Sequence, residues 1–127
     1  MKKLLNKKGF TLMEMLIVVA IIVILIAISV PTFTTQLSKS RDAVDEANVR
    51  SAKAVATAEY FSSDDVWTTT KYYDYKAEDG SLVDVATEDA ATTVKAYGEG
   101  SANKGKVIRI SVTETGVITT VWIEGAE

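Results

Sequence analysis

One apolar segment near the start of the chain limits its fold more than any other feature. From Phe10 to Val30 the only formally charged residue is Glu14. As a helix rising about 1.5 Å per residue, this segment would extend roughly 31 Å, the hydrocarbon thickness of a bilayer. A carboxylate inside such a segment costs about 2.5–3.5 kcal/mol on membrane-insertion scales, so Glu14 is predicted to have a function there.

The charges on the two sides of this segment differ in sign. Lysines 2, 3, 7 and 8 precede it, and the rest of the chain carries ten basic and seventeen acidic residues. Lysines resist translocation, which predicts an N-terminus inside the cell and a single-pass orientation in the cytoplasmic membrane. The acidic remainder then faces outward and offers no electrostatic reason to bind nucleic acid.

The composition argues against an enzyme. The chain has no histidine and no cysteine, which removes the commonest acid–base catalyst and any disulfide. It also lacks a phosphate-binding glycine loop and a serine in a nucleophile context. Six acidic residues lie close together in the sequence without the spacing of an EF-hand, so we expect a solvated loop, no metal and no cofactor: Asp64, Asp65, Asp74, Glu78, Asp79 and Asp84.

Helical periodicity resumes directly after Pro31, which should therefore kink the helix rather than end it. Small and apolar residues recur at steps of three, four, seven or eight, and they predict one amphipathic helix over residues 32–61. This expected buried stripe comprises Phe33, Leu37, Val44, Ala47, Val55 and Ala58, with Ser40 and Ser51 between them. Because it is rich in alanine and serine, another element can approach it closely.

The remaining residues predict a small head rich in strands. Apolar residues alternate over 106–113 and again over 117–124, and Gly116 between them predicts a β-hairpin. We expect a loop with one short strand over 66–80 and a short helix, capped at Thr87, over 87–97. A head this small needs the long helix to complete its core. The predicted fold is α+β, a long N-terminal helix packed against a small antiparallel sheet.

Residues 8–17 read Lys-Gly-Phe-Thr-Leu-Met-Glu-Met-Leu-Ile, which resembles the class III signal of type IV pilins and pseudopilins. The resemblance implies a leader peptide over 1–9, cleaved between Gly9 and Phe10 by a prepilin peptidase that also methylates the new amine of Phe10. It further implies a transmembrane or filament-core helix over 10–30, its amphipathic continuation over 31–62 and a head over 63–127. The implied partners are other copies of the chain and an inner-membrane assembly platform with an ATPase.

Glu14 has a defined chemical role in this interpretation. Cleavage converts the amide nitrogen of Phe10 into an α-amine, whose ordinary pKa is about 8. That cation can pair with Glu14 of its own chain or of a neighbour, and methylation leaves its charge in place. A buried ion pair of this kind sets the register of assembly.

The sequence also allows three other interpretations. A pseudopilin of a type II secretion or DNA-uptake machine would use the same N-terminal segment as a pilus subunit. A secreted soluble module would have an ordinary signal peptide cut after Ser29, but an acid within the apolar region is unusual for such a signal. A plain membrane anchor would need neither Gly9-Phe10 nor Glu14. The sequence leaves open whether the filament serves adhesion, twitching, DNA uptake or secretion, whether the subunit is major or minor, and whether it is glycosylated.

Overall fold

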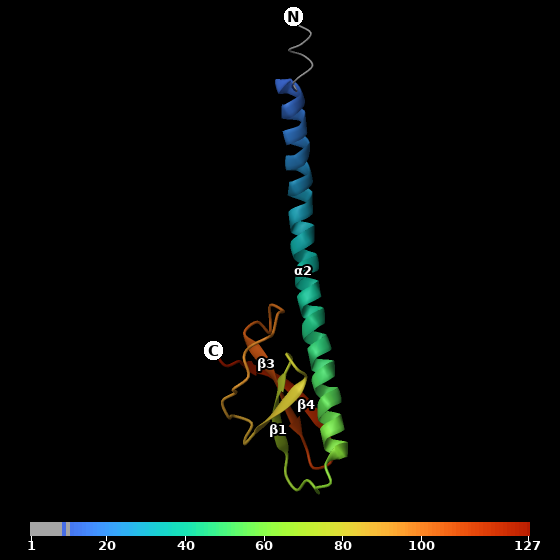
Figure 1. Ribbon diagram of the computed structural model, residues 1–127, viewed down its shortest axis with the longest axis vertical. Helices are drawn as coiled ribbons and strands as arrows, with labels where there is room; N and C mark the ends of the chain where they lie inside the picture. The colour runs from blue at the N-terminus through green and yellow to red at the C-terminus, as the bar shows by residue number, and fades with distance from the viewer. Residues whose placement is uncertain (1–8, 10) are drawn as a thin grey trace, which may run out of the picture. The chain divides into compact units, whose positions relative to one another are not determined.

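The computed structural model describes residue 9 and residues 11–127. The chain divides into two compact units, Met1–Leu37 and Ser38–Glu127, and we call the second unit the head. One helix, α2 (Leu12–Ser62), is followed by four strands: β1 (Lys71–Lys76), β2 (Ser81–Val85), β3 (Lys106–Val112) and β4 (Ile118–Glu124) (Figure 1). The α+β class predicted from the sequence is confirmed.

The strands form one antiparallel sheet in the order β2-β1-β3-β4. The predicted hairpin is β3-β4, in which Ile108 lies opposite Trp122 and Val112 lies opposite Ile118. Gly116, at φ +82°, supplies the left-handed backbone conformation that its turn requires. The first half of the sheet differs from the prediction, because residues 71–85 form two strands joined by a turn at Gly80 rather than a loop with one strand.

The core of the head lies between α2 and one face of the sheet. Ala52 and Ala56 are fully buried and belong to a cluster with side chains of β1 and β3, namely Tyr73, Tyr75, Ile108, Ile110 and Val112. Alanine has no side chain beyond Cβ, so the sheet approaches the helix backbone closely there. Figure 1 shows the sheet beside the last turns of α2.

The predicted buried stripe of α2 is wrong in position. Of its members, Val55 is partly buried against the core, but Val44, Ala47 and Ala58 are exposed, and the buried residues of α2 are Asp45, Ala52 and Ala56. Residues spaced as in the predicted stripe do share one face of a helix, but the sheet packs on a different face. Periodicity identifies an apolar face without identifying its partner.

The predicted short helix over 87–97 is also wrong, since that segment contains no helix and only a single turn, closed by the Ala90 amide on the Thr87 carbonyl at 3.2 Å. The backbone carbonyls of Glu88 and Ala90 accept hydrogen bonds from the Arg109 guanidinium instead. Further along, the carbonyl of Val94 accepts from the amide of Ala126, and Lys95 forms a bridge with Ala126. Contacts with residues distant in sequence thus replace the hydrogen bonds of a local helix.

Candidate functional site

The first part of α2 exposes its apolar side chains. None of the residues from Leu12 to Val44 is buried, and the large apolar side chains among them include Leu16, Ile22 and Ile26. By length and composition, α2 is long and apolar enough to cross a membrane. An uncovered surface of this kind is stable only in lipid or against other protein chains.

Glu14 lies at the N-terminus of this helix and forms a capping box with Thr11. The amide of Thr11 donates to Glu14 Oε2 at 2.8 Å, and the amide of Glu14 donates to Thr11 Oγ1 at 3.2 Å. Two of the unpaired amides at the helix start are thereby satisfied, and the carboxylate lies at the positive end of the helix dipole. The Thr-x-x-Glu spacing of Thr11 and Glu14 is the signal in the sequence from which this capping box could have been predicted.

The cleavage junction is described only on one side. Gly9 is exposed, and a Cβ added to it would meet no other atom within 4 Å. Phe10, the predicted new N-terminus and methylation site, lies outside the described residues. The cleavage, the methylation and the pairing of Glu14 with the Phe10 amine therefore remain predictions.

α2 continues without interruption through Pro31. Hydroxyl groups around this residue donate to helix carbonyls: Thr34 and Thr35 to Pro31 at 2.9 and 3.0 Å, and Thr32 to Ile28 at 3.2 Å. Proline removes one helix hydrogen bond, and serine or threonine side chains that bond back to carbonyls often accompany a bend. The kink at Pro31 remains a prediction with this added support.

A buried carboxylate on α2 fixes the loop that precedes β3 to the helix. Asp45 is 2% exposed and accepts hydrogen bonds from the amides of Glu99 and Gly100, both at 2.8 Å, and from Asn103 Nδ2 at 3.0 Å. A Cβ at Gly100 would lie 2.5 Å from Asp42 Oδ1, so the loop approaches the helix too closely for a side chain there. Asp45 is not distinguished in the sequence, because a single acid on an amphipathic helix looks like a solvated residue.

A buried ion pair lies on the other face of the sheet. Arg109 donates from Nε to Asp74 Oδ1 at 2.7 Å and from Nη2 to Asp74 Oδ2 at 2.8 Å, and the two residues face each other across β1 and β3. These hydrogen bonds raise the pKa of Arg109 above its ordinary value. Because the guanidinium also binds the carbonyls of Glu88 and Ala90, it holds the loop after β2 over the sheet.

Strands β1 and β3 stop pairing beyond this ion pair, and Tyr97 bridges them. Its hydroxyl donates to the carbonyl of Tyr75 at 2.8 Å and accepts from the amide of Ile108 at 3.0 Å. Burial raises the pKa of the Tyr97 hydroxyl well above its ordinary value. The phenol thus completes two backbone hydrogen bonds that the strands do not make to each other.

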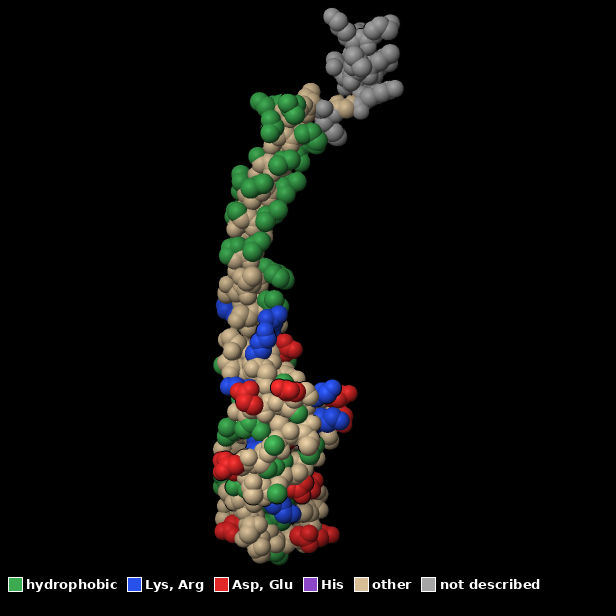
Figure 2. All heavy atoms as spheres, turned by 90° about the vertical axis from the view of Figure 1, so that its left-hand side faces the viewer, with side chains coloured by type: hydrophobic (Ala, Val, Ile, Leu, Met, Phe, Trp, Pro, Cys, Tyr) green, Lys and Arg blue, Asp and Glu red, His purple; other side chains and the backbone are tan. Residues whose placement is uncertain are grey.

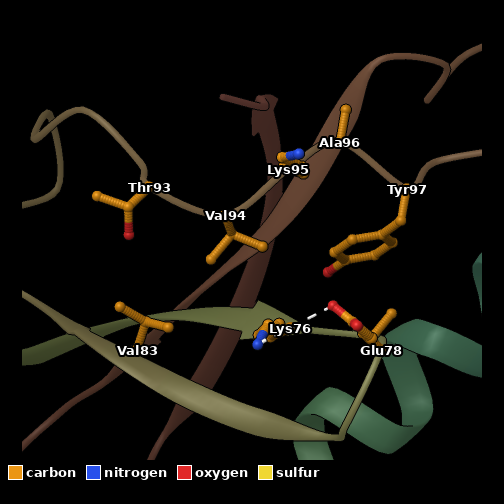
Figure 3. Close-up of a pocket in the computed structure, with 9 residues that line it drawn as sticks. Lys76, Glu78, Val83, Thr93, Val94, Lys95, Ala96 and Tyr97 are labelled. Carbon is orange, nitrogen blue, oxygen red and sulfur yellow. Dashed lines mark ion pairs between the residues drawn. The ribbon is translucent and has the colours of Figure 1, made fainter. Parts of the chain in front are cut away.

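A pocket of about 540 Å³ opens beside Tyr97, between the segment 93–97 and the β1-β2 hairpin. Val83 and Val94 face each other across it, and Lys76 and Glu78, on the same side as Val83, form an ion pair (Figure 3). Lys76 also contacts Asp79 Oδ2 at 3.2 Å. Because hydrogen bonds from Ser81 and then from Lys76 lower the pKa of Asp79 to about 2, this carboxylate stays charged and neutralises the lysine. Among residues 9 and 11–127, no three acidic side chains are placed to hold a metal ion.

Comparison with known proteins places these features in a family. Residues 4–30 match the prokaryotic N-terminal methylation motif. The chain is 31% identical over 112 residues to the fimbrial protein EcpC of Eikenella corrodens, an alignment that covers 87% of this chain and 66% of that protein.

A second relative matches a shorter stretch of the chain at higher identity. The type IV narrow pilus major component PilA5 of Thermus thermophilus is 49% identical over 55 residues, which cover 41% of this chain and 47% of that protein. The chain therefore spans about half to about two thirds of the length of these relatives. No solved structure matches it. The methylation motif, the apolar first part of α2 with its single carboxylate, and the pilin relatives together show that the chain belongs to the type IV pilin family.

Proposed function

We propose that this protein is a structural subunit of a type IV pilus-like surface filament. In this proposal a prepilin peptidase cleaves the chain between Gly9 and Phe10 and methylates Phe10, and an inner-membrane platform with an ATPase polymerises the product. The main support is the uncovered apolar surface of α2 from Leu12 to Val30, with Glu14 as its single charge. Lipid covers this surface before assembly, and the same helix of other copies covers it afterwards.

The geometry at Glu14 supports its proposed pairing with a neighbour. The Thr11 amide donates a hydrogen bond to Oε2 of Glu14 only, and Oε1 accepts none from residues 9 and 11–127. The capping box holds the carboxylate at the end of the helix, where Oε1 can accept from the α-amine of another copy. Pairing would cancel both charges in a low-dielectric surrounding, which lowers the cost of burying each of them.

The head leaves a second surface for contact between copies. The exposed residues Val44, Ala47 and Ala58 follow the predicted apolar stripe on α2, on a face that the sheet does not cover. Small residues permit close approach of a second helix. A pilus subunit, rather than a pseudopilin of a secretion or DNA-uptake machine, is favoured by the similarity to a narrow-pilus major component.

The first experiment measures the N-terminal mass of the protein recovered in sheared surface fractions. A chain that begins at Phe10, with or without one methyl group, supports the proposal. A chain that begins at Val30 would identify a secreted module with an ordinary signal peptide. An uncleaved chain confined to membranes would identify a plain anchor and contradict the proposal.

Variants at Glu14 separate its two roles. Glu14→Gln retains an acceptor for the Thr11 amide, as glutamine also serves in capping boxes, but it removes the charge. Thr11→Ala removes the hydroxyl of the box and keeps the charge. We expect Glu14→Gln to abolish filaments and Thr11→Ala to reduce them far less. The opposite order would show that Glu14 acts only as a helix cap.

A further inference from the structure

Strand β4 lies at one end of the sheet, and its outer edge is unpaired. On its inner side, the amide of Thr113 bonds to the carbonyl of Val117, and the amide of Gly125 bonds to the carbonyl of Gly105, both at 3.0 Å. In an antiparallel pair this alternation continues along the strands, so the odd-numbered residues of β4 bond to β3. The even-numbered residues direct their amides and carbonyls outward: Ile118, Thr120, Trp122 and Glu124. In the part of the chain that the structure describes, none of these outward groups has a hydrogen-bond partner.

The edge of β4 lacks the features that usually keep an edge strand from pairing with another chain. Such features include a short length, a charge within the strand and a proline. The opposite edge strand, β2, has five residues and contains the exposed carboxylate of Asp84. β4 has seven residues, contains no lysine or proline, and is charged only at its last residue, Glu124. Charged side chains of both signs are spread over the head (Figure 2), so the uncharged edge of β4 is open to a further strand.

The sequence of β4 is compatible with pairing to itself. A two-fold axis at Val121 pairs all seven residues and sets Thr120 of one copy opposite Trp122 of the other, with their outward backbone groups facing each other. Glu124 then lies opposite Ile118, so no like charges meet within the strands. Val121, which is 53% exposed, lies opposite its own counterpart. Pairs of β-branched and aromatic residues of this kind stabilise antiparallel sheets.

We propose that β4 of one copy pairs with β4 of a second copy across this axis and joins two four-stranded sheets into one. The inference rests on the proposed filament function. The axis is perpendicular to the joined sheets, and α2 packs along one sheet face, so the helices of the paired copies run in opposite directions. Subunits of one filament all point the same way. The contact therefore joins two filaments of opposite direction, such as those from two neighbouring cells.

A single contact of this kind is weak. An edge of seven residues buries little surface, whereas a stable interface buries about 1,000 Å² or more. Every subunit of a filament carries the same edge, and once two filaments are joined at one point, further contacts form at a high effective concentration. Filaments lying side by side therefore adhere through many weak contacts, while free subunits remain separate.

Charged substitutions at the axis test the contact in filaments of the full-length chain. Val121→Lys and Val121→Glu each set like charges directly opposite each other, whereas a mixture of the two filament types sets opposite charges there. We expect each variant alone to lower the bundled fraction about tenfold, since the loss recurs at every contact, and the mixture to restore it. Low-speed sedimentation and electron microscopy measure the bundles. Unchanged filament yield in sheared fractions shows that the variants fold and assemble.

The control is Val66→Lys, which places the same charge at an exposed valine outside β4 and should leave bundling unchanged. Wild-type filaments that stay separate, Val121→Lys filaments that bundle like this control, or a mixture that does not bundle would overturn the inference while leaving the proposed function intact. Normal bundling with lost adhesion to other surfaces would assign the edge to an external partner and also overturn it. An absence of wild-type filaments would overturn the proposed function itself.

Cysteine cross-linking tests the register, because the chain contains no cysteine. Val121→Cys sets two thiols across the axis at a Cα separation of about 4.5 Å, which permits a disulfide. Thr119→Cys lies on the same face of the same strand but about 14 Å from its counterpart, since each residue adds about 3.4 Å along a strand. Oxidised bundles should yield covalent dimers for Val121→Cys and monomers for Thr119→Cys. Equal cross-linking of the two variants would contradict the proposed axis.

Discussion

The two stretches of α2 differ both in composition and in burial, and the more apolar stretch is the one that is exposed. From Leu12 to Leu37 the helix is rich in large apolar residues and buries none of them. From Asp45 to Tyr60 it carries alanines, valines and charged residues, and there it buries two alanines and a carboxylate. Burial along this helix is therefore decided by the presence of a partner, and hydrophobicity alone does not predict it.

Carboxylates show the same contrast. Glu14 is exposed and caps the start of an apolar helix, whereas Asp45 and Asp74 are buried in the head with complete sets of hydrogen-bond donors. The buried carboxylates of the head are therefore satisfied within the chain. The first stretch of α2 instead exposes an apolar surface that is stable only against lipid or other protein chains.

The largest expected effect comes from breaking the buried ion pair. Arg109→Ala should destabilise the head by about 3–5 kcal/mol, because it leaves Asp74 buried without a cation. Urea unfolding of the full chain in detergent, followed by tryptophan fluorescence, measures this loss, since both tryptophans lie in the head. The double variant Asp74→Leu/Arg109→Met should recover most of the stability. A loss below about 1 kcal/mol in Arg109→Ala would show that the pair is not desolvated.

A matched pair of isoleucines tests the comparison of apolar environments directly. Ile110 is 0% exposed and Ile22 is 48% exposed. Ile110→Ala should cost the head about 2–5 kcal/mol through lost contacts and a cavity. Ile22→Ala should leave the unfolding transition of the head within about 0.5 kcal/mol. Equal effects of the two substitutions would contradict the assignment of Ile22 to an uncovered surface.

Two neighbouring acids on α2 sharpen the comparison within the head. Asp45→Ala removes the acceptor of three N–H donors and should cost about 1–3 kcal/mol. Glu46→Ala removes an exposed partner of Arg50 and should change stability by at most about 0.5 kcal/mol. The unfolding assay in detergent compares them, and similar losses would show that the loop before β3 does not depend on Asp45.

The smallest expected effect concerns Tyr97. Tyr97→Phe should cost about 1 kcal/mol by removing two hydrogen bonds of the hydroxyl. Because the folded protein raises the pKa of this phenol, its contribution is complete below the unfolded value of about 10 and is lost as the pH rises further. Thermal melts between about pH 8 and pH 11 should therefore fall less steeply for Tyr97→Phe than for the wild type. Parallel curves would contradict the role of the neutral hydroxyl.

The fold class and the β3-β4 hairpin were predictable, because helical length and strand alternation are properties of neighbouring residues. The second hairpin was missed, since residues 71–76 are tyrosines and charged residues whose alternation does not separate apolar from polar. Asp45, Arg109 and Tyr97 were missed for a different reason. Their partners lie 54, 35 and 22 residues away in the sequence, and no local pattern indicates such contacts.

The sequence by itself determined the N-terminal part of this protein. The apolar segment from Phe10, its single carboxylate and the Thr11–Glu14 spacing depend only on residues close together in the chain. The tertiary structure alone decided which face of α2 the sheet covers, which acids are buried and which surfaces remain for other copies. These outcomes depend on the summed packing and hydrogen bonding of distant segments, because a helix can present several faces and only one of them receives the sheet.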